Sequence, residues 1–358
     1  MQPARSWLQF SAFRSVALGL AGAAAIALNS IAAQAAEPAN GTALNVYSYR
    51  QEFLINPLIK AFEQETGINV KIVFAKEGLV QRLKAEGMNS PADVILTADI
   101  NRIEEFQAEG LLQPVTSEIL NANIPAQYHH PDGLWYGLTM RARAIYAHKT
   151  RVKPGEVTTY EDLAAPHMKG RVCTRSGKHP YNISLLASVI AAKGVDAAQA
   201  WIQGVKDNLA RRPQGNDRAQ VKAIKEGECD VSLGNSYYFG KMITNDQKPE
   251  EKEWADAVNI VFPNQNDRGT HVNVSTAAVT KSSKHREAAV KFLEFLSSDN
   301  AQRIFAAENF EYPLKKGVAV DPLVASWGTF KADDRNLAEI VSNHTEAAKI
   351  MDRVAFDH

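Results

Sequence analysis

The chain of 358 residues contains only two cysteines, which excludes a cysteine-based zinc or iron–sulfur site, because such sites need about four thiolates. It also lacks an excess of charge of either sign, since 40 Lys and Arg residues balance 40 Asp and Glu residues. That balance predicts no polybasic surface and no nucleic-acid partner. After residue 35, the sequence has no apolar run long enough to span a membrane.

The apolar content is 45% and the charged content 22%, which excludes a disordered chain. At about 100–200 residues per domain, a chain of this length suggests two domains.

The first 35 residues have the three parts of a secretory signal. Arg5 and Arg14 come first, an apolar run follows from Val16 to Leu28, and Ala33 to Ala35 offers a cleavage site. Removing this segment leaves 38 basic and 40 acidic residues. No cysteine near the cleavage site could take a lipid anchor, so we expect a free periplasmic protein of a Gram-negative cell.

Cys173 and Cys229 are expected to form a disulfide in such an exported protein. A loop of that length would stabilise the fold by about 4 kcal/mol in the chain-entropy model. The alternative is two separately buried thiols.

The first third of the mature chain alternates strands and helices. Strands are predicted at 44–47, 68–74 and 94–96, with helices at 56–66 and 79–86. The first of these helices is expected to open at Asn56-Pro57, which supply an N-cap and a preset φ. This βαβαβ order predicts a parallel sheet.

A second α/β region repeats the rhythm. Its predicted elements are strands at 170–173 and 230–233 and helices at 160–163, 183–192, 197–208 and 218–226.

Two long strand-like stretches, 137–148 and 271–280, flank the second α/β region, and an amphipathic helix follows at 286–296. If each stretch crosses between lobes, the fold is a two-lobed α/β protein with parallel-rich sheets and a ligand cleft between the lobes. The tail beyond about residue 313 carries helical patterns at 336–343 and 346–354, which we expect to pack on the second lobe. The predicted organisation is signal peptide 1–35, N-terminal lobe 36–140 and 270–312, and C-terminal lobe 141–269 and 313–358.

Tyrosines follow two of the predicted strands. Tyr181 comes after the strand that contains Cys173, and Tyr237 and Tyr238 come after the strand at 230–233. Adjacent tyrosines converge only if the backbone turns at that point, and the preceding Gly234 and Asn235 favour such a turn. A free tyrosine has a pKa near 10, so only a strongly polarising cation would displace its proton at neutral pH.

Ferric iron is such a cation, because it is hard and prefers oxygen ligands. Three phenolates would balance its charge, and Arg50 could hold a small anion such as carbonate against it. Two other interpretations stay open from the residues alone. The Tyr-Tyr pair could be a packed strand end or a sugar-stacking surface, and Arg50 could form a salt bridge.

In their order and spacing, several segments resemble the periplasmic ferric iron-binding proteins of ABC transporters, over nearly all of the mature chain. These segments are Leu44 to Gln51, Ser90 to Val94, Arg141 to Arg143, Arg175 to Tyr181, Gly215 to Arg218, Asn235 to Tyr238 and Phe262 to Gln265.

The resemblance implies a type II, transferrin-like binding protein that clamps Fe(III) and delivers it to an inner-membrane permease with its ATPase. It implies that Tyr181, Tyr237 and Tyr238 are the phenolate ligands. Arg50 and Gln51 would seat a synergistic carbonate or similar anion. We expect a monomer.

The chain departs from some members of that family, which carry a His-Tyr pair where this sequence has Gln51-Glu52. The sixth coordination position is therefore open between water, Glu52 and the anion. Arg141 and Arg143 share one face of a predicted crossing strand and are expected to pair across the lobes, with Arg143 also a candidate for the anion shell. His129 and His130 are expected at the surface.

The competing interpretation is a binding protein for an organic solute such as a polyamine, or for an oxyanion, in which the tyrosines line the cleft without metal. A polyamine would favour acidic residues and tryptophans at the strand ends, where this chain has mainly Tyr, Arg, Ser and Asn. We expect no enzyme, because the sequence shows no nucleophile elbow, phosphate loop or His-Glu-x-x-His motif.

Overall fold

The structure is a computed structural model that describes residues 43–50 and 52–358. The predicted signal segment and Gln51 lie outside these residues. No helix in the described part of the chain has the length and apolar character needed to cross a bilayer.

The described residues form a mixed α/β fold built on one curled sheet. Its strands are β1 (Ala43–Ser48), β2 (Asn69–Phe74), β3 (Val94–Thr97), β4 (Leu112–Gln113), β5 (Tyr136–His148), β6 (Val172–Cys173), β7 (Val231–Asn235), β8 (Val258–Val261), β9 (Val272–Thr280) and β10 (Tyr312–Pro313).

Helices cover the sheet in both halves of the sequence. They are α1 (Glu52–Thr66), α2 (Leu79–Glu86), α3 (Ile100–Ala108), α4 (Glu118–Asn123), α5 (Pro180–Lys193), α6 (Val195–Asp207), α7 (Asp217–Lys225), α8 (Ser236–Ile243), α9 (Glu250–Asp256), α10 (Arg286–Leu296), α11 (Asp299–Asn309), α12 (Pro322–Ala325), α13 (Leu337–Ser342) and α14 (His344–Arg353). Short 3-10 turns lie at Gly87–Asn89, Ala126–Tyr128, Glu161–Ala164 and Pro166–Met168.

The strand order along the sheet is β2-β1-β3-β9-β5-β7-β6, with β4, β8 and β10 paired to its long strands. Parallel pairing occurs between β1 and its neighbours β2 and β3, and between β6 and β7. The long strands β5 and β9 run antiparallel to their partners. The sheet is therefore mixed rather than uniformly parallel.

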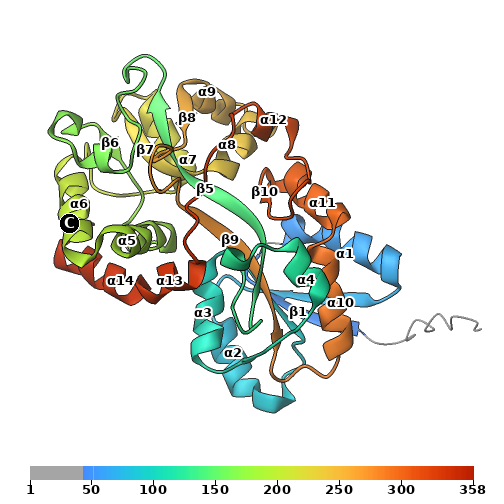
Figure 1. The fold of residues 1–358 in the computed structure, drawn as a ribbon. Coiled ribbons are helices and arrows are strands. Elements are labelled where there is room, and N and C mark those ends of the chain that lie inside the picture. Colours follow the sequence, from blue (N-terminus) through green and yellow to red (C-terminus); the bar gives the residue numbers. More distant parts are fainter. Residues whose placement is uncertain (1–42, 51) are drawn as a thin grey trace, which may run out of the picture. The chain divides into compact units, whose positions relative to one another are not determined.

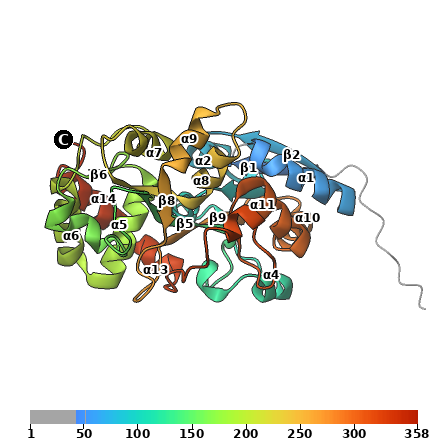
Figure 2. The same cartoon turned by 90° about the horizontal axis from the view of Figure 1, so that it is seen from above.

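Strand β5 connects two groups of elements, as the sequence predicted for a crossing stretch. Its first half pairs with β9 and β10, and its second half pairs with β7 and β8. In Figure 1, β5 and β9 run between a group that contains β1, α1 and α10 and a group that contains α5, α6 and α7. The same separation is visible from above in Figure 2. The lobe boundaries given above stay a prediction.

Helix α1 begins earlier than the sequence predicted, at Glu52, so Pro57 lies inside it. The buried face explains the difference, because Ile55, Leu58 and Phe62 are all fully buried. Burial of such side chains stabilises by about 1.5–3 kcal/mol each, enough to offset the roughly 3 kcal/mol cost of an interior proline.

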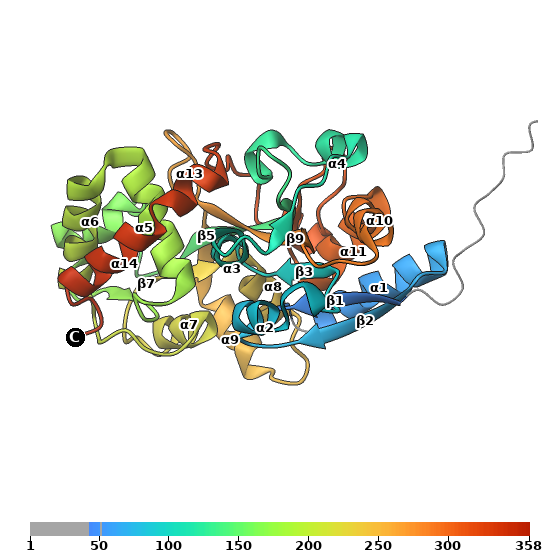
Figure 3. The ribbon, with the colours of Figure 1, turned by 90° about the horizontal axis from the view of Figure 1, so that it is seen from below.

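The C-terminal helices α13 and α14 lie against α5, and α14 also contacts α6. Figure 3 shows this packing, with both helices beside α5. Helix α13 also contacts α3 of the first α/β region. Cys173 and Cys229 form a disulfide, as predicted.

Candidate metal centre

Tyr181 lies in the first turn of α5, shortly after β6. Pro180 occupies the first turn of this helix, and His179 is its N-cap residue, whose Nδ1 accepts a hydrogen bond from the Tyr181 backbone N–H at 3.2 Å. The two rings also meet edge to face, with centroids 4.5 Å apart. The cap therefore fixes the backbone and the ring of Tyr181 together.

Tyr237 and Tyr238 lie in the first turn of α8, which follows β7 directly. Their rings are in contact, with centroids 4.1 Å apart. The chain turns just before these tyrosines, as predicted, because β7 ends at Asn235 and Asn235 is the N-cap residue of α8. A Cβ at Gly234 would collide with the Tyr146 ring, and this close approach is the reason for glycine there.

The three tyrosines predicted from the sequence come together in the structure. The phenol groups of all three lie close enough to interact electrostatically. Burial raises the pKa of both Tyr181 and Tyr237; Tyr238 raises both further, and Tyr181 also raises that of Tyr237. Without a cation, these hydroxyls are therefore neutral at physiological pH.

Guanidinium groups lie over the faces of these rings. Arg143 and Arg175 stand 5.7 and 5.2 Å from the centroid of Tyr181, and Arg218 stands 5.4 Å from that of Tyr238. Arg141 is the cation that lowers the pKa of Tyr181 and Tyr237, because positive charge beside a phenol favours its ionised form. Burial outweighs this effect, so the pKa of both residues stays above the usual value.

Arg50 is buried and is held by groups other than the tyrosines. Its Nη2 donates to Glu311 Oε2 at 2.8 Å, and its Nη1 donates to Ser275 Oγ at 2.5 Å. Burial alone would raise the pKa of Glu311, but Arg50 and Arg141 outweigh it and hold that pKa below its usual value. The salt bridge that the residues left open for Arg50 is therefore present.

Arg141 has a more open guanidinium than Arg50. Its Nη1 donates to the same Ser275 Oγ at 3.2 Å, while its buried Nη2 has no hydrogen-bond partner among the described residues. It lies close enough to Tyr181 and Tyr237 to interact electrostatically with both. From the sequence, Arg141 is predicted only to pair across the lobes, although its shared face with Arg143 in a period of two is a signal for a place near the site.

The remaining candidates are placed as follows. Glu52 is exposed at the start of α1. His129 and His130 belong to a loop in which His129 Nδ1 lies 3.0 Å from the His130 carbonyl oxygen. Across residues 43–50 and 52–358, His, Cys, Asp and Glu side chains form no group of three arranged to hold a metal ion.

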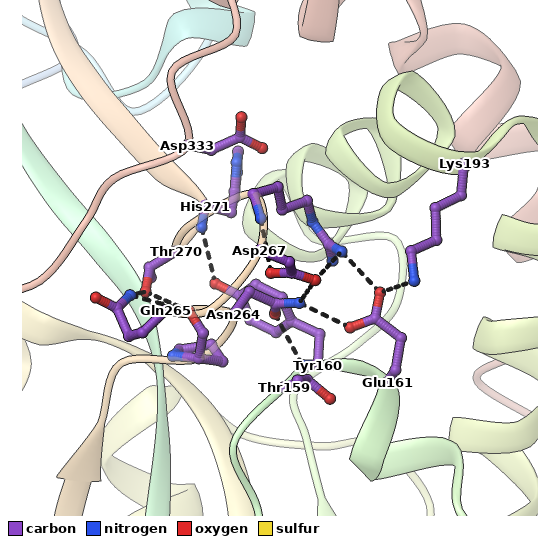
Figure 4. Close-up of polar contacts among 12 residues, drawn as sticks. Thr159, Tyr160, Glu161, Lys193, Asn264, Gln265, Asp267, Thr270, His271 and Asp333 are labelled. Atoms are coloured by element: carbon purple, nitrogen blue, oxygen red, sulfur yellow. Dashed lines mark hydrogen bonds and ion pairs between the residues drawn. The ribbon is translucent and has the colours of Figure 1, made fainter.

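The segment Phe262 to Gln265, quoted in the resemblance, fixes the approach to β9. Buried Asn264 accepts from the Tyr160 backbone N–H at 3.0 Å and donates to Glu161 at 2.9 Å. Figure 4 shows these contacts, together with the bond from the His271 backbone N–H to the Tyr160 hydroxyl. The motif is thus a structural anchor beside the crossing strands.

The fold and the tyrosine cluster define the class of this protein, a type II periplasmic binding protein with two groups of elements joined by crossing strands. Residues 89–338 match the family model described as bacterial extracellular solute-binding protein, and the chain belongs to this family.

Curated relatives place the chain in the group that contains the ferric iron-binding proteins. It is 45% identical over 320 residues to iron uptake protein A1 of Synechocystis, covering 89% of each chain. It is 30% identical over 302 residues to the major ferric iron-binding protein of Neisseria meningitidis, covering 82% of this chain and 86% of that protein.

Solved structures agree. Ferric iron-binding protein A of Mannheimia haemolytica, in an open conformation, matches with a TM-score of 0.85 at 49% identity, covering 88% of this chain and 99% of that one. A Trichodesmium protein in complex with iron and citrate ligands matches with a TM-score of 0.85 at 43% identity and the same coverages. The family and fold predicted from the sequence are confirmed.

Proposed function

We propose that this protein is the periplasmic ferric iron-binding component of an ABC importer, and that Tyr181, Tyr237 and Tyr238 bind the cargo iron as phenolates. One observation carries the proposal: three phenol groups, drawn from two separate helix starts, lie close enough to interact electrostatically, and the rings of Tyr237 and Tyr238 are in contact. Hard Fe(III) is the cation that such oxygens suit. The relatives are named as iron uptake and ferric iron-binding proteins, and these names support the same cargo.

Iron uptake at this site displaces phenol protons, because the ligands must be deprotonated. The pKa values of Tyr181 and Tyr237 are raised by burial, so the protons are held until a trivalent cation competes for the oxygens. Affinity therefore falls as the pH falls. An organic cation such as a polyamine does not displace phenol protons in this way. The guanidinium groups of Arg143, Arg175 and Arg218 would also repel it.

We further propose that a small anion completes the iron coordination and that Arg141 is its principal contact. The Nη2 of Arg141 is a buried donor without a partner in the described structure. In Arg50 only Nε is left in that state, because Nη1 and Nη2 are engaged by Ser275 and Glu311. A buried unsatisfied guanidinium N–H costs free energy that an anion would recover. Arg50 and Arg141 both donate to Ser275 Oγ, so Arg50 would add positive charge close to the anion.

Delivery to a membrane permease and its ATPase follows from the solute-binding family. Hinge motion at β5 and β9 would close the two groups of elements over the iron, with closure stabilised by the bound ion.

The proposal is tested by adding ferric iron, as the citrate complex, to the purified mature protein with and without bicarbonate. We expect one iron per chain and a visible phenolate-to-iron charge-transfer band. A colourless protein that takes up no ferric iron, while an amine or a sugar stabilises it against heat, would contradict the iron assignment.

Replacing Arg141 by glutamine tests the anion contact. We expect the iron affinity of R141Q to fall by about 10–100-fold, the usual cost of losing an outer-shell partner. The bicarbonate or citrate dependence of binding should also weaken. An R141Q protein whose anion dependence equals that of the wild type would assign the anion to other residues.

A further inference from the structure

Asp217, the first residue of α7, is completely buried. Its carboxylate binds residues that hold the starts of both tyrosine-bearing helices, α5 and α8. We propose that Asp217 is a positioning residue that fixes the three tyrosines in one geometry before iron arrives. This inference rests on the proposed iron-binding function. Asp217 itself is not assigned as a ligand.

The first support is the junction that carries Tyr237 and Tyr238. Asp217 Oδ2 accepts a hydrogen bond from the Asn235 backbone N–H at 2.9 Å. Asn235 is the last residue of β7 and directly precedes α8. On the opposite side of this residue, the Tyr146 hydroxyl donates to the Asn235 carbonyl at 2.8 Å. The point from which both tyrosines leave the sheet is therefore held from two directions.

The second support reaches Tyr181 through Arg143 of β5. Arg143 Nη1 donates to Asp217 Oδ2 at 2.7 Å, and the same guanidinium donates from Nη2 to the side-chain oxygen of Asn182 at 2.8 Å. Asn182 is the neighbour of Tyr181 in α5. Nη1 also reaches the Asn235 side-chain oxygen at 3.1 Å. One ion pair thus links the start of α5 to the start of α8.

The third support is Arg175, on the segment between β6 and α5. Its Nη1 donates to Asp217 Oδ1 at 3.0 Å. Each carboxylate oxygen of Asp217 therefore holds a different guanidinium, and both guanidinium groups lie over the ring of Tyr181. Burial would raise the pKa of Asp217, but these two cations outweigh it and keep the pKa below its usual value.

The negative charge of Asp217 is needed because the carboxylate lies between two positive guanidinium groups, those of Arg143 and Arg175. Arg143 is also fixed at its backbone, where its carbonyl accepts from the Tyr160 hydroxyl at 2.5 Å. Without the carboxylate, the guanidinium groups of Arg143 and Arg175 would repel each other beside Tyr181. The neutral Asn of an Asp217→Asn variant keeps the size of the side chain and removes this charge.

We therefore expect the D217N variant to bind one ferric ion with about 10–100-fold lower affinity, as measured by competition with citrate. Its charge-transfer band should be displaced in wavelength and reduced in absorptivity, because the phenolate geometry is loosened. Arg175→Gln provides a second variant whose side chain is less buried. R175Q should change the band in the same direction, by less, and it serves as the test if D217N does not fold.

Asp93→Asn is the matched control. Asp93 is also buried, and like Asp217 it accepts a hydrogen bond from a backbone N–H, that of Asn45 at 2.9 Å. It directly precedes β3, in the first α/β region, and is not part of the tyrosine cluster. A purely structural role predicts that D217N and D93N lose thermal stability with unchanged iron affinity and band, and that result would overturn the proposal. A wild-type protein without any ferric band would instead overturn the proposed function. The two failures are thus distinguishable.

Discussion

Replacement of Tyr237 by phenylalanine is expected to remove most of the ferric charge-transfer absorption and to lower iron affinity by more than the roughly 10–100-fold that loss of an outer-shell partner costs. Tyr237 interacts electrostatically with both Tyr181 and Tyr238 in the cluster. Its loss removes one anionic oxygen and leaves the other two without their shared neighbour. Titration with ferric citrate, followed in the visible range, measures both effects.

Tyr312→Phe is the matched control for this experiment. Tyr312 is buried, and its hydroxyl has no hydrogen-bond partner among the described residues. Removing that hydroxyl leaves the phenol cluster intact, so affinity and colour should match the wild type. If Y237F binds and colours like Y312F, the three-phenolate centre is wrong.

Loss of the disulfide is expected to give the largest change in stability. The bridged residues are 56 positions apart in the sequence. Replacing both Cys173 and Cys229 by serine should lower the free energy of unfolding by about 4 kcal/mol in the chain-entropy model. Urea denaturation of the variant, beside the wild type with and without reductant, measures the difference.

The variant should still bind iron when folded, because neither cysteine contributes a ligand to the proposed centre. If reductant leaves the unfolding midpoint of the wild type unchanged while the double variant is destabilised, the effect belongs to the serine substitutions and not to the bridge.

The elements with clear periodicity were predictable from local sequence. The helix at Arg286–Leu296 and the two crossing strands lie where their apolar patterns placed them. The start of α1 was not predictable in this way. Asn56-Pro57 indicated a helix start, but burial of Ile55 in the core favours a helix that begins earlier, at Glu52. The contact of Gly234 with the ring of Tyr146 was not predictable either, because it joins residues far apart in the sequence.

The candidate site divides in the same way. The three tyrosines were found because each follows a strand, and a strand end is a local feature. The partners of the arginines were not found, because they are distant in sequence. Glu311 binds Arg50 across 261 positions, and Asp217 binds Arg143 across 74. The segment Gly215 to Arg218 is part of the resemblance, but the sequence indicates no role for any of its residues. In the structure, Asp217 of this segment binds Arg143 and Arg175.

The Tyr160 hydroxyl has a mechanical consequence, since it bonds the carbonyl of Arg143 on β5 and the N–H of His271 at the start of β9. The hydroxyl adds a cross-link beside the ladder that pairs the two strands, so in the proposed closure we expect bending to fall away from it, toward Thr139 and Thr276. Both tyrosine-bearing helices would then move together. The iron would meet a preassembled set of oxygens in the unclosed protein, and closure would govern how long it stays rather than whether it can be captured.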